Sequence, residues 1–176
     1  MATNGLQQRI WLVAHDFSPR AEAAMTLAVD ELCELPGAAR IVLLHVVQPA
    51  PAAAGELSTL SVAFGKLEHQ AVDEAMQRLE AIAHSASAHA KARERQLMVE
   101  CTIRIGRAAD CILEEAETGS VERIIVGTHG RRGLGRLVMG SVAELVVRKA
   151  HVPVLVAHDA ARGHHNLSPA TPGDSP

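Results

Sequence analysis

Residues 126–141 read VGTHGRRGLGRLVMGS, and the interpretation of the whole chain starts from this stretch. It holds five glycines, three arginines and no acidic residue, and the run 124–126 before it is typical of a buried strand. Glycine lets backbone N–H groups approach an anion, and the first turn of a helix offers further unpaired N–H groups. A helix beginning near Gly140 and Ser141 would complete a phosphate-binding segment. The stretch therefore predicts a strand, an anion-binding loop and a helix.

The same strand-then-helix unit recurs on both sides of this stretch. Short apolar runs predict strands at 10–14, 41–47, 121–127 and 152–158, and apolar residues at helical spacing predict helices at 21–32, at 64–86, at 109–116 and from residue 142. Residues 97–105 alternate apolar with mostly polar side chains, which indicates an edge strand. Strands that alternate with helices predict an α/β fold, with a parallel sheet covered by helices on both faces.

The connection at 48–62 contains proline, alanine and glycine and is predicted to be a loose loop. Because it leaves the end of a strand where ligands bind in such sheets, we expect it to form a mobile flap near the site. Residues 159–176 are rich in proline, glycine, serine and histidine and are predicted to be a disordered tail. One ordered domain is thus expected over residues 8–158.

The overall composition excludes several classes of protein. A length of 176 residues suits one domain, and 48% hydrophobic residues with 2% aromatic residues predict an aliphatic core. A net charge of -3 argues against a nucleic-acid binder, and no apolar run is long enough to span a membrane. The three cysteines lack metal-finger spacing, and no signal peptide is evident. We expect a cytoplasmic protein.

Four residues of the opening stretch, Gly127, Gly130, Gly140 and Ser141, follow the spacing G-x2-G-x9-G-S. Together with Asp16 in HDFS, the segment LLHVV and the closing VPVLV, this spacing resembles the ATP-binding branch of the universal stress protein family. The resemblance covers residues 8–158. It implies a Rossmann-like (adenine nucleotide alpha hydrolase-like) fold with an open five-stranded parallel sheet of order 3-2-1-4-5. It further implies ATP as the ligand, with or without Mg²⁺, a homodimer and a role in stress responses.

The resemblance also assigns roles to positions of this sequence. Asp16 is expected to contact the adenosine, and the backbone of Val46 is expected to lie beside the adenine. Gly127 and Gly130 would line the ribose and phosphates, and Gly140 and Ser141 would hold the phosphate chain. The candidate site is completed by their neighbours Ala14, His15, Val126, His129, Arg131, Arg132, Gly133 and Val142.

Several of these residues have structural explanations that stay open at this point. Ser141 and Glu144 have the spacing of a helix capping box, and Asp16 or Ser18 could cap the first helix. The three arginines could simply belong to a solvated loop. His15, His45 and His129 all fall at strand ends and could form a metal site, but ordinary hydrogen bonds are favoured and no metal is expected.

The sequence favours binding over catalysis. It has no G-x-S-x-G elbow and no clear base for attack by water on a phosphate, so at most slow ATP hydrolysis is expected. The favoured function is a nucleotide-dependent stress-response or signalling module. The alternative is a dimeric scaffold of the same fold that binds no nucleotide and acts through protein partners. A homodimer is expected through the apolar last strand, 152–158, and the downstream protein partner is unknown.

Overall fold

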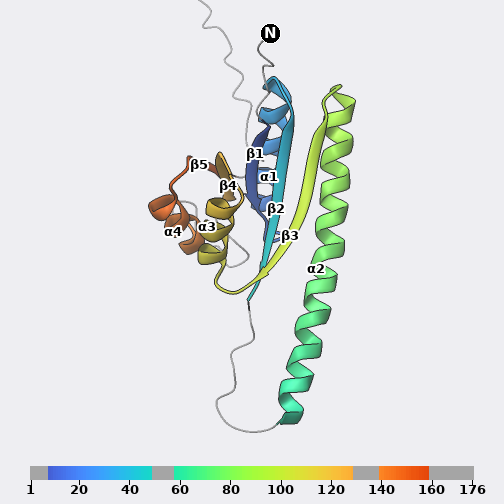
Figure 1. The fold of residues 1–176 in the computed structure, drawn as a ribbon, viewed down its shortest axis with the longest axis vertical. Helices are drawn as coiled ribbons and strands as arrows, with labels where there is room; N and C mark the ends of the chain where they lie inside the picture. Colours follow the sequence, from blue (N-terminus) through green and yellow to red (C-terminus); the bar gives the residue numbers. More distant parts are fainter. Residues whose placement is uncertain (1–7, 49–57, 129–138, 159–176) are drawn as a thin grey trace, which may run out of the picture.

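The computed structural model describes residues 8–48, 58–128 and 139–158, and of residues 58–67 it describes the backbone alone. Strands and helices alternate strictly along these residues (Figure 1). The elements are β1 (Arg9–Ala14), α1 (Pro19–Glu34), β2 (Ala39–Val47), α2 (Ser58–Ala92), β3 (Leu97–Ile105), α3 (Ala108–Thr118), β4 (Arg123–Gly127), α4 (Ser141–Lys149) and β5 (Val154–Ala157).

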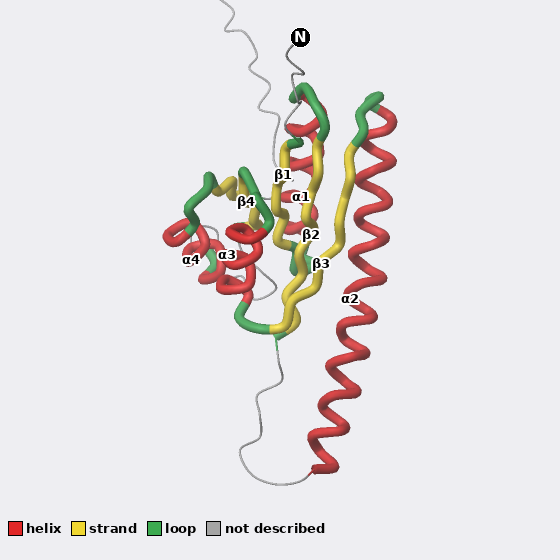
Figure 2. The backbone as a smooth tube through the Cα atoms, in the orientation of Figure 1, coloured by secondary structure: helices red, strands yellow, loops and turns green. Residues whose placement is uncertain are grey.

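The five strands form one parallel sheet of order β3-β2-β1-β4-β5, which confirms the predicted fold class (Figure 2). The chain starts at the centre of the sheet, builds outward to β3, and then crosses back to place β4 on the other side of β1. The strand order therefore reverses between β1 and β4. In sheets of this kind, ligands bind at the carboxyl ends of the strands beside such a reversal.

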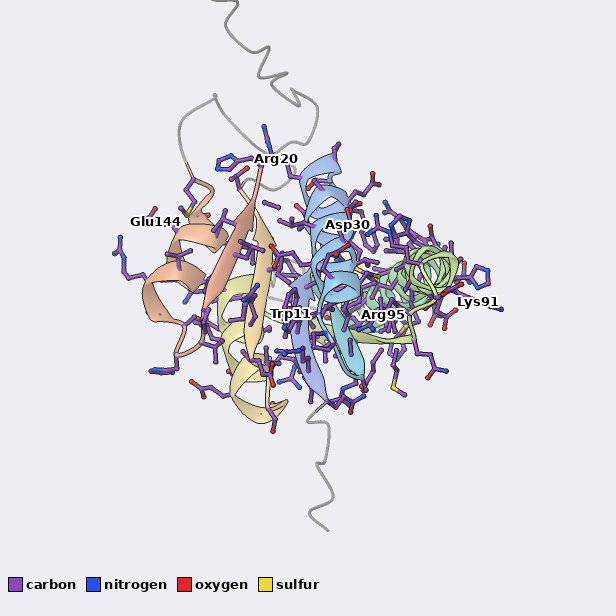
Figure 3. All side chains as sticks on the ribbon, turned by 90° about the horizontal axis from the view of Figure 1, so that it is seen from above. Trp11, Arg20, Asp30, Lys91, Arg95 and Glu144 are labelled. Atoms are coloured by element: carbon purple, nitrogen blue, oxygen red, sulfur yellow. The ribbon has the colours of Figure 1, made fainter. Side chains whose placement is uncertain are left out.

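The core has two layers because successive side chains of a strand point to opposite faces. Trp11 and Val13 of β1 pack with α1 and α2, whereas Leu12 packs with α3 and α4. Figure 3 shows α3 and α4 on the opposite side of the sheet from α1. Trp11 is 2% exposed, and the guanidinium of Arg123 lies 4.5 Å from its ring centre. These aliphatic layers confirm that the core is built with almost no aromatic residues.

The edge position predicted for β3 is confirmed. Val99, Cys101 and Ile103 pack toward the α1 and α2 layer, whereas Met98 on the other face is 60% exposed. On that outer face, Glu100 of β3 forms an ion pair of 3.2 Å with Arg40 of the neighbouring β2. One buried face and one solvated face explain the period of two in this segment.

The predicted connection at 48–62 was too long. Residues 58–62 belong to α2, which runs on to Ala92 and so is longer at both ends than the predicted 64–86. These first residues contain neither glycine nor proline, so nothing in them stops the helix from starting early. The first turns of α2 extend past the carboxyl ends of the strands (Figure 1). Residues 49–57, the rest of the expected flap, lie outside the described residues.

The last two strands are shorter than predicted. β4 begins at Arg123 rather than at residue 121, and β5 covers Val154–Ala157 rather than 152–158. Pro153 precedes β5 and accepts a hydrogen bond from the Ile124 N–H through its carbonyl, but it has no N–H of its own to continue the strand. The predicted tail at 159–176 lies outside the described residues. None of the helices described here is long and apolar enough to cross a membrane.

Candidate functional site

The carboxyl ends of β1 and β4 lie side by side where the strand order reverses, and a helix follows each of them. β1 ends at Ala14, and α1 begins at Pro19 after a turn of four residues. α4 starts at Ser141, after the predicted glycine-arginine loop. The two helices leave to opposite faces of the sheet (Figure 3). The site is therefore bounded by two helix N-termini, one on each side of the reversal.

The turn from β1 into α1 satisfies its own polar groups. Asp16 accepts a hydrogen bond from the Ser18 N–H through Oδ1 (3.1 Å), and Ser18 Oγ accepts one from the Ala21 N–H (3.3 Å). Ser18 is thus the N-cap of α1, which decides between the two capping residues considered from the sequence. Asp16 shapes the turn instead, and its carboxylate is half-buried at the edge of the sheet.

His15 is buried at the end of β1, and its ring has a defined role in the same turn. Its Nδ1 accepts a hydrogen bond from the Phe17 N–H (3.1 Å), which places the proton of the neutral ring on Nε2. Nε2 is buried and has no partner among the described residues. Burial lowers the pKa of His15 from 6.5 to about 4, with His45 and Arg78 adding to the shift and Asp16 opposing it. The ring therefore stays neutral near pH 7.

Phe17 connects this turn to α2 through its ring. Its φ is 62°, a left-handed conformation that is strained for a bulky residue. The ring lies 4.5 Å from the ring of His45 on β2, and the guanidinium of Arg78 on α2 lies 3.8 Å from its centre. The turn thus joins β1, β2 and α2 at one point of the carboxyl edge.

The start of α4 is arranged differently from the start of α1. The Gly140 N–H donates to the Thr128 carbonyl (2.6 Å), so the end of β4 fixes the first residue of the helix. Gly140 is the N-cap and makes no side-chain capping bond. Within the described residues, no acceptor faces the N–H groups of Ser141, Val142 and Ala143. This helix end is open in the way that an anion-binding site requires.

The alternative explanation of Ser141 and Glu144 as a capping box is wrong. Ser141 is the first residue of α4 rather than its N-cap. The Glu144 side chain bonds Arg148 (2.5 Å) and does not reach back to the start of the helix. Glu144 and Arg148 are four residues apart on the same helix and form an ion pair instead. The spacing of Ser141 and Glu144 in the sequence was therefore misleading. The Ser141 side chain is exposed at the open end of the helix.

Gly127 has a structural role in addition to any contact with a ligand. A Cβ at this position would lie 3.0 Å from the carbonyl carbon of Arg20 and 3.1 Å from its Cβ. The first turn of α1 therefore packs closely against the end of β4, and a larger residue at position 127 would force the backbone of Arg20 to shift. This packing accounts for the glycine alongside the contact with ribose and phosphates that the family resemblance implies.

The remaining predicted site residues fall into two groups. Ala14, Val46 and Val126 pack on the α3 and α4 side of the sheet, at or near the ends of three neighbouring strands. Val142 is 36% exposed in the first turn of α4. The other members of the predicted set lie outside the described residues: His129, Gly130, Arg131, Arg132 and Gly133.

Two of the three strand-end histidines come together through hydrogen bonding. His45 Nδ1 lies 2.7 Å from the His15 carbonyl oxygen, and His15 Nδ1 accepts from Phe17, as described above. Among residues 8–48, 58–128 and 139–158, no group of three histidine, cysteine or acidic side chains is arranged to hold a metal ion. The third histidine, His129, lies outside these ranges.

Comparison with known proteins identifies the family. The model of the universal stress protein family matches residues 9–158. The chain belongs to the universal stress protein family. This assignment agrees with the fold and with the order of the strands.

Relatives of similar length extend the match along most of the chain. A universal stress protein from Thermus aquaticus, encoded 3′ of a QAH/OAS sulfhydrylase, is 30% identical over 146 residues, which cover 82% of this chain and 95% of that protein. Universal stress protein MJ0577 from Methanocaldococcus jannaschii is 26% identical over 80% of this chain and 89% of its own length. The solved structure of MJ0577 superposes with a TM-score of 0.69, 27% identity, and coverage of 85% and 95% of the two chains.

Three residues at this carboxyl edge were not predicted from the sequence. Thr128 is 3% exposed, and its carbonyl positions α4. Its place between Gly127 and His129 in the GTHG segment was a usable signal. Phe17 lies within HDFS, but nothing in that segment indicates a left-handed backbone. Arg78 comes from the middle of α2 and carried no signal at all, because only the fold brings it to Phe17.

Proposed function

We propose that this universal stress protein binds an adenine nucleotide, expected to be ATP, at the carboxyl edge between β1 and β4. The nucleotide would change how the protein engages its partners in a stress response. Binding, with at most slow hydrolysis, is the proposed activity. His15 does not supply a base for hydrolysis, because Nδ1 already accepts a hydrogen bond and Nε2 carries the proton.

The observation that carries this proposal is the open N-terminus of α4. Its amides at Ser141, Val142 and Ala143 have no acceptor among the described residues, and the helix dipole adds positive potential at the same point. The bond from Gly140 to Thr128 holds this end beside the reversal of strand order. A phosphate chain fits these donors, and no covalent chemistry is needed to retain it.

The base and sugar would lie across the ends of β1 and β2 on the α3 and α4 side. Ala14 and Val46 are half-buried there and offer a small apolar surface. Asp16 is also half-buried at this edge, where its carboxylate can accept hydrogen bonds from a ribose. A pocket with apolar walls and a few polar groups is the usual design for a nucleotide site.

Two solved structures of the same fold support the choice of ligand class. One is a universal stress protein in complex with cAMP, at a TM-score of 0.57 and 20% identity. The other is a family member from Arabidopsis thaliana with AMP bound, at a TM-score of 0.52 and 20% identity. At this identity they share the fold with this chain, and they indicate that the fold accommodates an adenine nucleotide.

Titration of the full chain with ATP and Mg²⁺ in a calorimeter tests the proposal. Gly140 has an extended N-cap conformation, so Gly140→Asp would place a carboxylate on the open amides of α4 and repel phosphate. We expect at least about tenfold weaker binding. The matched control is Gln96→Asp, which puts the same carboxylate on an exposed residue just before β3, at the amino-terminal end of the parallel sheet, and should leave affinity unchanged.

Equal affinity in both variants would contradict the phosphate site at α4. If the natural sequence binds neither ATP, ADP nor AMP, the nucleotide proposal fails and the scaffold alternative takes its place. Thermal unfolding followed by circular dichroism shows whether each variant is folded at the temperature of the titration.

The proposal includes a homodimer through β5. This strand pairs with β4 on one side, and in the described part of the chain no strand covers its other side. The adjoining α4 segment exposes apolar side chains at Met139, Val142 and Val147. A free strand beside an apolar surface suits a symmetric contact between two copies. Sedimentation at micromolar concentration tests it, since a single monomeric species would rule the dimer out.

A further inference from the structure

A groove of about 620 Å³ lies between α2 and β3, on the edge of the sheet away from β5. Its apolar lining includes Met76 and Ala83 of α2 and Val99 of β3, and Cys101 lies beside them. α2 and β3 run side by side along much of their length (Figures 1 and 2). The groove therefore follows the direction of an exposed strand.

The backbone of β3 is oriented to pair with a further strand. The Gly106 N–H donates to the Val47 carbonyl of β2 (3.0 Å). In a parallel ladder, alternate residues direct both their N–H and C=O groups to the same neighbour, so the even-numbered residues of β3 face β2. The odd-numbered residues, including Val99 and Cys101, direct these groups outward. The same two residues thus line the groove and present free backbone groups at the edge.

This edge lacks the usual protection against pairing. β3 spans nine residues and contains neither proline nor lysine, and both its charged side chains, Glu100 and Arg104, form ion pairs with the chain itself. Within the described residues, β2 is the one strand that pairs with β3. A long edge without blocking residues accepts an added strand readily.

The charge of the groove indicates which partner fits. Glu80 lines it from α2, and Asp73 lies on the same helix face two turns earlier. After burial, the Glu80 carboxylate is the second cause that raises the pKa of the Cys101 thiol, so the charge acts within the groove. Lys91 lies in the last turn of α2, past Ser87, which lines the groove. Glu80 is thus the one acidic side chain among the lining residues of the groove, which also include His84 and Ser87.

We propose that this groove binds an extended segment of a partner protein, which adds to β3 as a strand and places a lysine or arginine side chain beside Glu80. Small apolar side chains of the segment pack against Met76 and Ala83, and its backbone bonds the outward groups of Val99 and Cys101. This mode of recognition takes affinity from the main chain and specificity from alternate side chains. The groove is separate from the proposed phosphate site, because α2 and α4 pack on opposite faces of the sheet.

A fluorescein-labelled nonapeptide of alternating valine and threonine with one central lysine is the probe, and fluorescence anisotropy with the full chain is the measurement. We expect saturable binding, weakened about tenfold when the lysine is replaced by glutamate. N-methylation of the peptide residues that face β3 should abolish binding, whereas N-methylation of the alternate residues should not. This pattern distinguishes an added strand from simple charge attraction.

Glu80→Lys in the protein should weaken the lysine peptide and strengthen the glutamate peptide. Glu74→Lys is the matched control, because it makes the same charge change on another face of α2, where Glu74 bonds Gln70. Equal effects of the two variants, equal binding of all peptides, or no binding would overturn the proposal. So would sedimentation showing that Glu80→Lys changes self-association, since a second copy of the chain would then occupy the edge.

Discussion

The N-termini of α1 and α4, both at the carboxyl edge of the sheet, differ in how their first backbone N–H groups are hydrogen-bonded. At α1 the chain provides everything: Ser18 caps the helix, Asp16 accepts the Ser18 N–H, and Pro19 brings no N–H to be satisfied. At α4 the cap is Gly140, which has no side chain to contribute. The start of α1 is therefore capped by its own side chains, whereas the start of α4 has no capping side chain and keeps N–H groups that can bind an anion. Among the described residues, the proposed phosphate site is thus the helix start that has no capping side chain.

The largest predicted effect is a loss of stability when His15, in the turn between β1 and α1, is protonated. The pKa of this residue is lowered to about 4 in the fold from 6.5, so the unfolded chain binds the proton more readily. Stability is full above about pH 6.5 and falls as the pH drops toward 4, by about 3 kcal/mol in total from this group. Urea unfolding of the natural sequence and of His15→Asn across that range measures the difference. A variant with the same pH slope as the natural sequence would contradict the assignment.

A second prediction concerns the contact between the first turn of α1 and the end of β4. In Gly127→Ala the new Cβ would press on the backbone of Arg20, which cannot rotate away as a side chain can. We expect a loss of about 2 kcal/mol in the free energy of unfolding, measured by urea denaturation without nucleotide. An unchanged midpoint would show that α1 can shift freely, and that the glycine is there for the ligand alone.

The third prediction opens the closed helix start. Ser18→Ala removes the cap of α1 and leaves the Ala21 N–H without its acceptor, which should cost about 1 kcal/mol of stability. Because the phosphates are proposed to bind at α4, affinity for ATP should not change. Calorimetry that showed a large loss of affinity would mean that the α1 end also belongs to the phosphate site.

The smallest prediction closes the open helix start without adding charge. Gly140→Ser offers a hydroxyl to the amides of α4, and the extended backbone there accepts any residue. We expect a gain of about 0.3 kcal/mol in the nucleotide-free protein, measured by urea denaturation. A loss of stability instead would indicate that the side chain has no room between α4 and the end of β4.

The order of elements was predictable because each strand is a short apolar run and each helix has regular apolar spacing. The edge position of β3 followed from its period of two, and the sheet order followed from the family resemblance. The start of α2 did not follow, because residues 58–62, which read STLSV, carry neither a helix stop signal nor a clear helical spacing of apolar residues. The last strand was predicted too long, because the apolar run at 152–158 extends beyond the residues that pair in β5.

In the site, single residues were predictable where local chemistry decides, and unpredictable where packing decides. The position of Gly140 at the start of α4 followed from the glycine spacing. The contacts of Gly140 and Asp16 with a ligand, which the family resemblance implies, stay predictions. The role of Gly127 against Arg20, and the contact between Arg78 and Phe17, depend on elements that are distant in sequence. Glu144 was misjudged for a local reason. Its side chain could reach back to the start of α4 or forward to Arg148, and it pairs with Arg148.

The position of Trp11 makes its fluorescence a natural probe of the structure. The chain has one tryptophan and no tyrosine, so nearly all of its intrinsic ultraviolet emission comes from this indole. The ring is buried in β1, and it is paired in register with Arg123 of β4, whose guanidinium covers it. Separation of these two strands would expose the fluorophore and shift its emission to the red. Opening of the sheet at its central seam can therefore be followed optically without any label.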